Sequence, residues 1–201
     1  MKKPHWMLGL AAVFFTFAFT SCEEQSEVSE YANWKERNQL FIDSIAFVAQ
    51  NNPNEWRIIK AYDLPDDDSD NLATKKDVND YIYCHIEEVG EGSRSPIYTD
   101  SIRANYRVRL INDEIIDQSY RGDFNPAISV PAKFSMSGGM IKGWVTALQR
   151  MHIGDLWTVY MPYTLGYGTN GSNPIPGYST LIYSINLAGI YPTGTTVPAW
   201  K

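Results

Sequence analysis

The residues that most often carry out bond-making chemistry are few in this chain and stand apart from one another. After residue 21 the sequence has two histidines, His85 and His152, and neither has a cysteine or histidine companion at zinc-ligand spacing. Neither shares a motif with a serine, so the aligned nucleophile and base of a hydrolase are not indicated. A glycine-rich phosphate loop is also missing. The sequence therefore argues against metal, hydrolytic and nucleotide chemistry, and it predicts no cofactor.

Cysteine and the acidic residues add no reactive site. Cys84 lies in an alternating apolar run, where we expect a small buried hydrophobic side chain rather than a reactive thiol. The acidic stretch at 64–71 lacks the alternating ligands, glycine and closing glutamate of a calcium loop, so it is predicted to be a solvated linker.

A second set of residues, rich in aromatic rings and glycine turns, runs through the C-terminal half. In chain order the set comprises Tyr106; Ile116-Asp117; Pro131-Ala132-Lys133-Phe134; Met140-Ile141-Lys142-Gly143-Trp144; Met151-His152-Ile153-Gly154-Asp155; Gly166-Tyr167-Gly168; and Ile175-Pro176-Gly177-Tyr178-Ser179-Thr180-Leu181. In order and spacing it resembles the FKBP-type peptidyl-prolyl cis/trans isomerase family over residues 80–190. Each motif alone is weak, and their succession in order is specific.

The resemblance implies a catalytic pocket without acid, base or metal. Trp144 is expected as its floor, with Tyr106, Tyr183 and Ile141 as walls. The Ile141 backbone N–H would bond a substrate carbonyl, because it lies in the first turn of a helix. Asp117 would orient the twisted amide, and the Tyr167 hydroxyl would bond the chain after the proline. The resemblance further implies substrate contacts from Ile116, Phe134, Met140 and Ile175.

Each assignment has a structural alternative, and the pattern has departures. Trp144 at helical spacing could belong to the core, and Asp117 could be a turn residue. The family usually has an aromatic residue where Ile116 stands, and Ala132 replaces a second pocket aromatic. These departures predict a wider pocket and leave slow or altered catalysis open, unless Phe124 in the preceding loop fills the gap.

The elements that must position these residues follow from periodicity. Residues 102–110 alternate strictly between apolar and polar, which predicts a strand with one buried face. Further strands are predicted at 156–161 and 181–187, and one short helix at 141–151. The fold class is therefore α+β. The resemblance specifies a half-open antiparallel sheet wrapped around one short helix, preceded by an N-terminal helical segment.

The N-terminal half is predicted to carry an export signal and a tether. A basic start, an apolar run and small residues before Cys22 describe a signal peptide, and the cysteine resembles the acylated residue of a bacterial lipoprotein. Trp34, Phe41, Ile45 and Val48 are expected to form the apolar stripe of a helix. The predicted order is signal peptide 1–21, tether 22–30, helical segment 31–62, acidic linker 63–79, FKBP-like domain 80–191 and tail 192–201.

Charge and composition limit the partners. A net charge of -6 argues against nucleic-acid binding. The expected partners are proline-containing polypeptides and, through the N-terminal lipid, the membrane of a Gram-negative cell envelope, with dimerisation through residues 31–62 also open. Three functions are compatible with the sequence: a prolyl isomerase, a non-catalytic peptide-binding or chaperone module, and a surface lipoprotein for adhesion or glycan capture.

Overall fold

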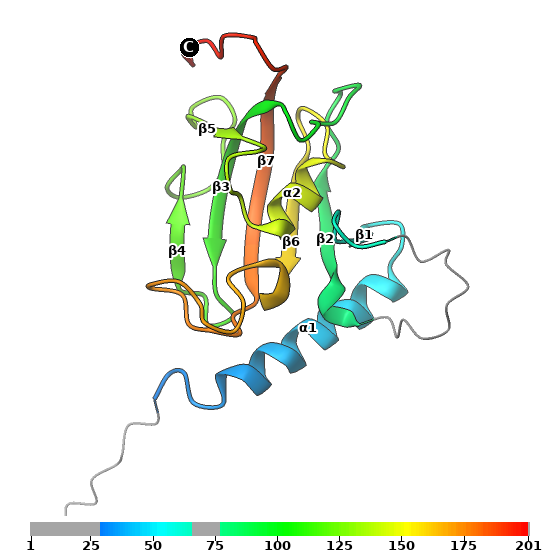
Figure 1. The fold of residues 1–201 in the computed structure, drawn as a ribbon, viewed down its shortest axis with the longest axis vertical. Helices are drawn as coiled ribbons and strands as arrows, with labels where there is room; N and C mark the ends of the chain where they lie inside the picture. The colour runs from blue at the N-terminus through cyan, green and yellow to red at the C-terminus, as the bar shows by residue number, and fades with distance from the viewer. Residues whose placement is uncertain (1–28, 66–76, 201) are drawn as a thin grey trace, which may run out of the picture. The chain divides into compact units, whose positions relative to one another are not determined.

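The computed structural model describes residues 29–65 and 77–200 (Figure 1). The predicted signal peptide, the lipidation site Cys22 and most of the tether lie outside the described residues, as do residues 66–76 of the predicted linker. The chain divides into units 1–32 and 33–201; residues 29–32 of the first form a turn, and all that follows concerns the second. None of the helices in the described ranges is long and apolar enough to span a membrane.

The second unit is built on one antiparallel sheet of seven strands. The strands are β1 (Trp56–Lys60), β2 (Tyr81–Glu88), β3 (Ser101–Arg109), β4 (Ile115–Gln118), β5 (Ala132–Ser135), β6 (Leu156–Met161) and β7 (Leu181–Tyr191). Their order across the sheet is β1-β2-β6-β7-β3-β4, and β5 shares the outer edge of β3 with β4. The three strands predicted from alternation are confirmed, because apolar side chains at every second position are buried on one face.

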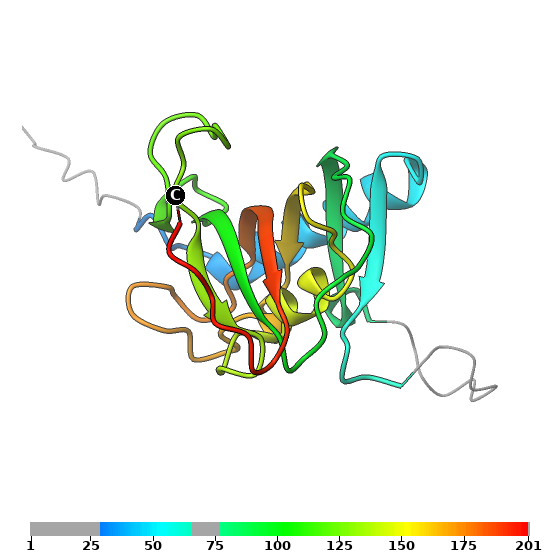
Figure 2. The same cartoon turned by 90° about the horizontal axis from the view of Figure 1, so that it is seen from above.

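That buried face is covered by α2 (Lys142–Leu148), which lies on one side of the row of strands (Figure 2). All of its residues after Lys142 are buried, and they share the main hydrophobic core with β2, β3, β6 and β7. Two short 3-10 helices, Val78–Asp80 and Tyr163–Leu165, complete the regular structure in the described part of the chain. The predicted α+β architecture with a short covering helix is confirmed.

Two cross-strand rows on the buried face place the functional residues. One row runs through paired positions from edge to edge: Arg57, Cys84, Val159, Tyr183, Val108 and Asp117. The neighbouring row is Ile86, Trp157, Ile185 and Tyr106. Residues paired across adjacent strands lie on the same face. The face therefore carries an arginine at one edge and an aspartate at the other.

The helical segment predicted at 31–62 is broken at Asn51-Asn52-Pro53, as that sequence predicts. α1 spans Trp34–Asn51, and residues 56–60 of the segment form β1 instead of helix. Pro53 cannot continue a helix, and the side-chain amides of Asn51 and Asn52 bind the last-turn carbonyls of Phe47 and Val48. β1 then pairs with β2. The compact unit therefore begins before the expected boundary at residue 80.

The buried face of α1 also differs from the predicted stripe. Trp34, Asn38, Ile42, Ala46 and Ala49 are buried, whereas Val48 is exposed and Phe41 and Ile45 are only half-buried. The prediction followed the largest apolar side chains, but small alanines and a polar asparagine face the domain.

A hydrogen bond from the domain explains why Asn38 is inside, and a second bond is made by Trp34 beside it. Asn38 Oδ1 accepts from the Thr180 N–H at 2.7 Å, and the Trp34 indole donates to Ser179 Oγ at 2.9 Å. These bonds attach the first turns of α1 to the segment entering β7. The later turns pack Ile42, Ala46 and Ala49 against Trp56 and Tyr83.

Candidate active site

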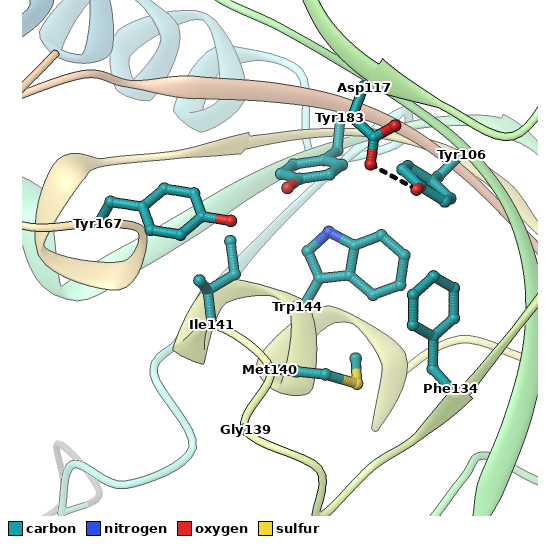
Figure 3. A pocket seen from close by; sticks show the side chains of 9 residues that line it. All are labelled: Tyr106, Asp117, Phe134, Gly139, Met140, Ile141, Trp144, Tyr167 and Tyr183. Atoms are coloured by element: carbon teal, nitrogen blue, oxygen red, sulfur yellow. Dashed lines mark hydrogen bonds between the residues drawn. The ribbon is translucent and has the colours of Figure 1, made fainter. Parts of the chain in front are cut away.

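A cavity of about 220 Å³ opens at the start of α2. The residues that line it are Tyr106, Asp117, Phe134, Gly139, Met140, Ile141, Trp144, Tyr167 and Tyr183 (Figure 3). They come from β3, β4, β5, α2, β7 and two loops, so residues far apart in sequence converge on one hollow.

Trp144 is the centre of this cavity. Its ring centroid lies 5.5 Å from that of Tyr106 and 5.3 Å from that of Tyr183, both edge-to-face, and 5.1 Å from that of Phe134. Such pairs contribute about 0.5–1.5 kcal/mol each beyond area burial. The ring is only 5% exposed, so it serves the core and the cavity floor together. Both alternatives considered for Trp144 therefore describe it correctly.

The Trp144 indole N–H is buried and makes no hydrogen bond of standard geometry in the described part of the chain, although its interaction with the Tyr183 hydroxyl lowers the pKa of that phenol against the effect of burial. It points toward the side of the cavity where Tyr183 and Asp117 lie (Figure 3). Packing of the surrounding rings, and not a hydrogen bond of standard geometry, therefore holds the indole in place.

Asp117 acts on Tyr106 across the β3–β4 pair. The Tyr106 hydroxyl donates to Asp117 Oδ2 at 2.6 Å. Burial raises the pKa of Tyr106, and the hydrogen bond and charge of Asp117 raise it further. Burial likewise raises the pKa of Tyr183. Both phenols therefore keep their protons to a higher pH than an ordinary tyrosine, and Tyr106 is held in one orientation.

The turn before α2 supplies a backbone donor. Ile141 is the N-cap residue, and its carbonyl accepts from the N–H groups of Trp144 and Val145. Its own N–H has no acceptor among the residues that the structure describes. Gly139, with φ of 81°, makes the turn and lines the cavity. The run Ser137-Gly138-Gly139 is typical of a turn, but no role in the site was predicted for it.

Tyr167 reaches the cavity from the loop between β6 and β7. It is 39% exposed, and its hydroxyl faces the hollow (Figure 3). Two backbone bonds brace the loop beside it, from Gly168 N–H to the Tyr163 carbonyl and from Tyr178 N–H to the Gly168 carbonyl. A second donor is therefore held at the mouth.

Most of the residues proposed for the site lie together, and two do not. Ile116 is the extra residue where the β3–β4 pairing shifts, and it packs against the core instead of lining the cavity. Ile175 is 7% exposed and also belongs to the core. The side chains of Tyr106, Asp117, Phe134, Met140, Ile141, Trp144, Tyr167 and Tyr183 all reach the cavity.

The departures from the family pattern have a structural answer. Ala132 pairs with Ala104 and does not line the cavity, and Phe134, two residues later on β5, supplies the aromatic ring beside Trp144. Phe124 does not fill a gap there; it packs against Tyr120 at 5.3 Å. The cavity is therefore more aromatic than the sequence suggested.

The arrangement can bind a flat, apolar ring with an attached amide. Its floor and walls are aromatic, and the Ile141 N–H and the Tyr167 hydroxyl can hold carbonyl groups at the mouth. In residues 29–65 and 77–200 no cluster of three or more His, Cys, Asp or Glu side chains could hold a metal. The chemistry available is exclusion of water and orientation of an amide.

Comparison with known proteins agrees with this geometry. Residues 92–188 match the family described as FKBP-type peptidyl-prolyl cis-trans isomerase. The chain is 38% identical over 107 residues to the peptidyl-prolyl cis-trans isomerase Mip of Coxiella burnetii, covering 52% of this chain and 43% of that protein. It is 37% identical over 102 residues to FK506-binding protein 2 of Aspergillus oryzae, covering 50% of this chain and 72% of that protein.

A solved peptidyl-prolyl cis-trans isomerase from Pseudomonas syringae pv. tomato superposes with a TM-score of 0.47 at 27% identity, covering 55% of this chain and 75% of that one. The match spans less than half the length of the Coxiella protein and nearly three quarters of the Aspergillus protein. From the matched residues and that coverage, we conclude that this chain belongs to the FKBP-type peptidyl-prolyl cis-trans isomerase family.

Proposed function

We propose that the protein is a peptidyl-prolyl cis/trans isomerase that acts on proline-containing polypeptides. Rotation about an amide bond has a barrier of about 18–20 kcal/mol, because resonance must be broken. The twisted amide has lost much of its charge separation, so it is less polar than either planar isomer. A dry aromatic cavity favours it over the ground state, which accelerates rotation without bond-making.

The observation that supports this proposal is the set of four rings around one hollow. Trp144, Tyr106, Phe134 and Tyr183 surround the space where a proline ring would sit. The Ile141 N–H and the Tyr167 hydroxyl then hold the flanking carbonyls. Asp117 fixes the hydroxyl of Tyr106 through its 2.6 Å hydrogen bond and so keeps the wall in place.

The direct test follows isomerisation of a short proline peptide catalysed by the full chain. Trp144→Ala is expected to lower kcat/KM at least about a hundredfold, because the cavity loses its floor. Trp200→Ala is the control, since Trp200 lies in the C-terminal tail against Arg103 and outside the cavity. If Trp144→Ala does not fold, Asp117→Asn provides a second test, because it changes the cavity without removing its floor and should also lower kcat/KM. A wild-type rate at background would reject the proposal, and tight peptide binding at that background rate would identify a non-catalytic module.

We further propose that acyl chains on Cys22 tether the protein to a Gram-negative cell envelope. The support is the sequence of residues 1–22, with its lysines, apolar run and cysteine. Labelled palmitate should enter the wild-type chain and not the Cys22→Ala variant. Equal labelling of both would contradict the proposal.

Dimerisation through residues 31–62 remains a proposal that two exposed side chains support. Leu40 and Phe47 on α1 are 70% and 69% exposed, and at a spacing of seven residues they lie along one side of the helix. Sedimentation of the wild type and of Leu40→Glu tests this. A wild-type monomer at high concentration would contradict it.

A further inference from the structure

A second cavity, of about 370 Å³, lies on the same face of the sheet, past the other end of α2. Its apolar walls come from Ile58 and Ile59 on β1, Ile86 on β2, Trp157 on β6 and the exposed Val89. Trp157 occupies the same cross-strand row as Tyr106, two strands away, which fixes the shared face. We call this hollow the arginine cavity, for the two guanidinium groups of Arg57 and Arg150 that line it.

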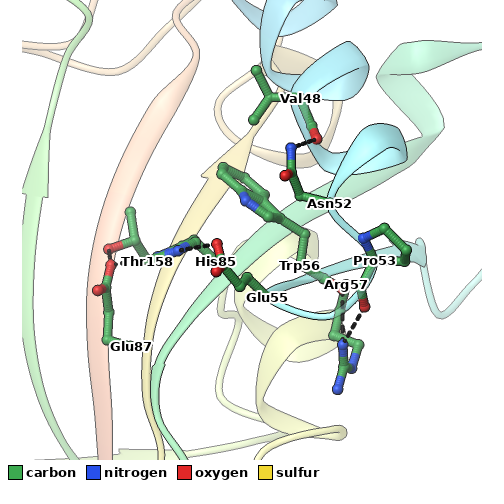
Figure 4. A network of polar contacts seen from close by, with 9 residues as sticks. All are labelled: Val48, Asn52, Pro53, Glu55, Trp56, Arg57, His85, Glu87 and Thr158. Atoms are coloured by element: carbon green, nitrogen blue, oxygen red, sulfur yellow. Dashed lines mark hydrogen bonds and ion pairs between the residues drawn. The ribbon is translucent and has the colours of Figure 1, made fainter.

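Arg57 is held in place without being neutralised. Its Nη1 donates to the carbonyl oxygens of Pro53 and Trp56, at 3.0 and 2.9 Å (Figure 4). In the same view Arg57 points away from Trp56 and from the polar network of His85, in keeping with opposite faces of β1. Neutral carbonyls fix the group and leave its charge intact.

Arg150 is the second cation. Its side chain is exposed, and it makes no ion pair or hydrogen bond with any residue in the ranges that the structure describes. A neighbouring cavity of about 290 Å³ shares Ile59 and Arg150, so the hollow continues past this residue. Arginine matches the two oxygens of a carboxylate with parallel N–H groups.

One carboxylate also lines the cavity, and its oxygens are already occupied. Asp155 is 2% exposed and accepts from the backbone N–H groups of Gly90 and His152, both at 2.7 Å. His152 also lines the cavity, with its Nδ1 3.8 Å from Asp155 Oδ2, and the two guanidinium groups and this carboxylate leave one net positive charge before any charge on that imidazole is counted. A ligand with one negative charge balances it, whereas a second negative charge would be repelled by Asp155.

The backbone around the cavity is closely packed. A Cβ atom on Gly90 would stand 2.2 Å from the Ile153 carbonyl oxygen and 2.5 Å from the Asp155 nitrogen. Only glycine permits this approach between the end of β2 and the turn after α2. The Gly92 N–H adds a bond to the same Ile153 carbonyl at 3.1 Å.

We infer that the arginine cavity binds an apolar monocarboxylate, with the apolar group against Trp157 and Ile86 and the carboxylate on Arg150 and Arg57. A free organic acid and the C-terminal residue of a polypeptide share this chemistry. The site is separate from the cavity around Trp144, which we call the proline cavity, since the two have no lining residue in common.

The test uses the full chain and matched probes that differ only in charge. N-acetyl-leucine is titrated in parallel with N-acetyl-leucinamide while the indole N–H signals are followed by NMR, with the Trp157 signal identified from Trp157→Phe. The acid should shift the Trp157 signal and bind at least about tenfold more tightly than the amide. Equal binding of acid and amide, or shifts confined to Trp144, would overturn the inference.

Variants locate the charge. Arg150→Gln should weaken binding of the acid about tenfold or more, and Arg57→Gln should act in the same direction. Arg121→Gln, which removes the same charge on an exposed loop, should leave the affinity unchanged. Arg150→Gln is the decisive variant because that side chain makes no described contact whose loss could unfold the protein. Unchanged affinity in Arg150→Gln would overturn the inference.

A second arm distinguishes the two sources of the carboxylate. A proline-free peptide ending in leucine is compared with its C-terminal amide and with N-acetyl-leucine. Tighter binding of the peptide acid supports a chain terminus that continues along Ile59, and equal binding of the two acids supports a free organic acid. Equal binding of peptide acid and peptide amide contradicts the site.

Discussion

The two cavities at the ends of α2 are built on the same face of the same sheet, and they differ in their edge residues. One cross-strand row ends in Asp117 at the β4 edge and in Arg57 at the β1 edge. The proline cavity has five aromatic side chains and one acid, whereas the arginine cavity has one tryptophan, three isoleucines, a histidine, one acid and two arginines. The sheet and helix therefore supply two hollows, and residues of the edge strands and of the turn after α2 give them different charges.

Each cavity also contains a tryptophan with a buried indole N–H that makes no hydrogen bond of standard geometry in the described ranges. Trp144 and Trp157 are 5% and 6% exposed, so their contributions to the core are similar. Substituting each tryptophan in turn therefore separates the effect of a buried indole on stability from its effect on ligand binding.

The largest expected effect comes from truncating these rings. Trp144→Ala and Trp157→Ala should each lower the free energy of unfolding by about 3–5 kcal/mol, since each leaves a cavity in the core. Urea unfolding measures this, and isomerisation is assayed on the folded fraction. Trp157→Ala should keep far more isomerase activity than Trp144→Ala. The comparison fails if both variants lose activity equally per folded molecule.

Gly90→Ala should disturb the arginine cavity alone. The added methyl group meets backbone atoms of Ile153 and Asp155, and such overpacking costs about 1–3 kcal/mol. Thermal unfolding measures the cost, and amide exchange should become faster near residues 88–92 and 152–156. Gly122→Ala adds only the strain of a φ of 68°, with no atom within 4 Å of the new group, and should cost less. Equal costs would show that close packing is not the reason for Gly90.

Asp117→Asn should have a moderate effect on the proline cavity. The variant removes the charge beside the Tyr106 hydroxyl and weakens a hydrogen bond of a kind that contributes about 1.5–3 kcal/mol when one partner is charged. The pKa of Tyr106 should fall, because one cause of its rise is lost. Absorbance of the phenolate against pH measures it, with Tyr106→Phe identifying the signal. An unchanged titration would contradict the contact.

The smallest expected effect is a pH dependence of stability that comes from a tyrosine of the proline cavity. Burial raises the pKa of Tyr183 above the ordinary value of 10.0, whereas the arginine cavity has no tyrosine in its lining. The folded form therefore keeps a proton that the unfolded chain loses above pH 10. The contribution of Tyr183 to the free energy of unfolding should be fully present below pH 10. Above that pH it should decline by at most about 1.4 kcal/mol per pH unit. Urea unfolding from pH 8 to 11 measures the slope, which Tyr183→Phe should reduce; an equal slope in that variant would contradict it.

Strand alternation and ordered motifs made much of the proline cavity predictable. Tyr106 and Tyr183 sit on strands whose period of two assigns their face, and Trp144 lies in a short helix found by its spacing. Ile116 was misplaced because a bulge is set by pairing between strands, which one sequence does not display. Phe134 was expected to contact the substrate, and the register of β5 on β3 is the reason that Phe134, and not Ala132, reaches Trp144.

The arginine cavity was not predicted, for a related reason. Arg57 lies in a segment expected to be helical, and only the pairing of β1 with β2 brings it to the sheet. The inner face of α1 was also predicted wrongly. It is formed by Asn38 and alanines, and Asn38 is buried through a partner more than a hundred residues away. Local pattern identifies elements well, and it identifies partners poorly.

The two hydrogen bonds from Trp34 and Asn38 to Ser179 and Thr180 have a mechanical consequence. A pulling force applied to the first turn of α1 passes through them to the segment that enters β7. β7 lies between β6 and β3 in the interior of the sheet, whereas the backbone continues from α1 into the edge strand β1. A load on α1 is therefore shared between the centre of the sheet, through the two hydrogen bonds, and its edge, through the chain.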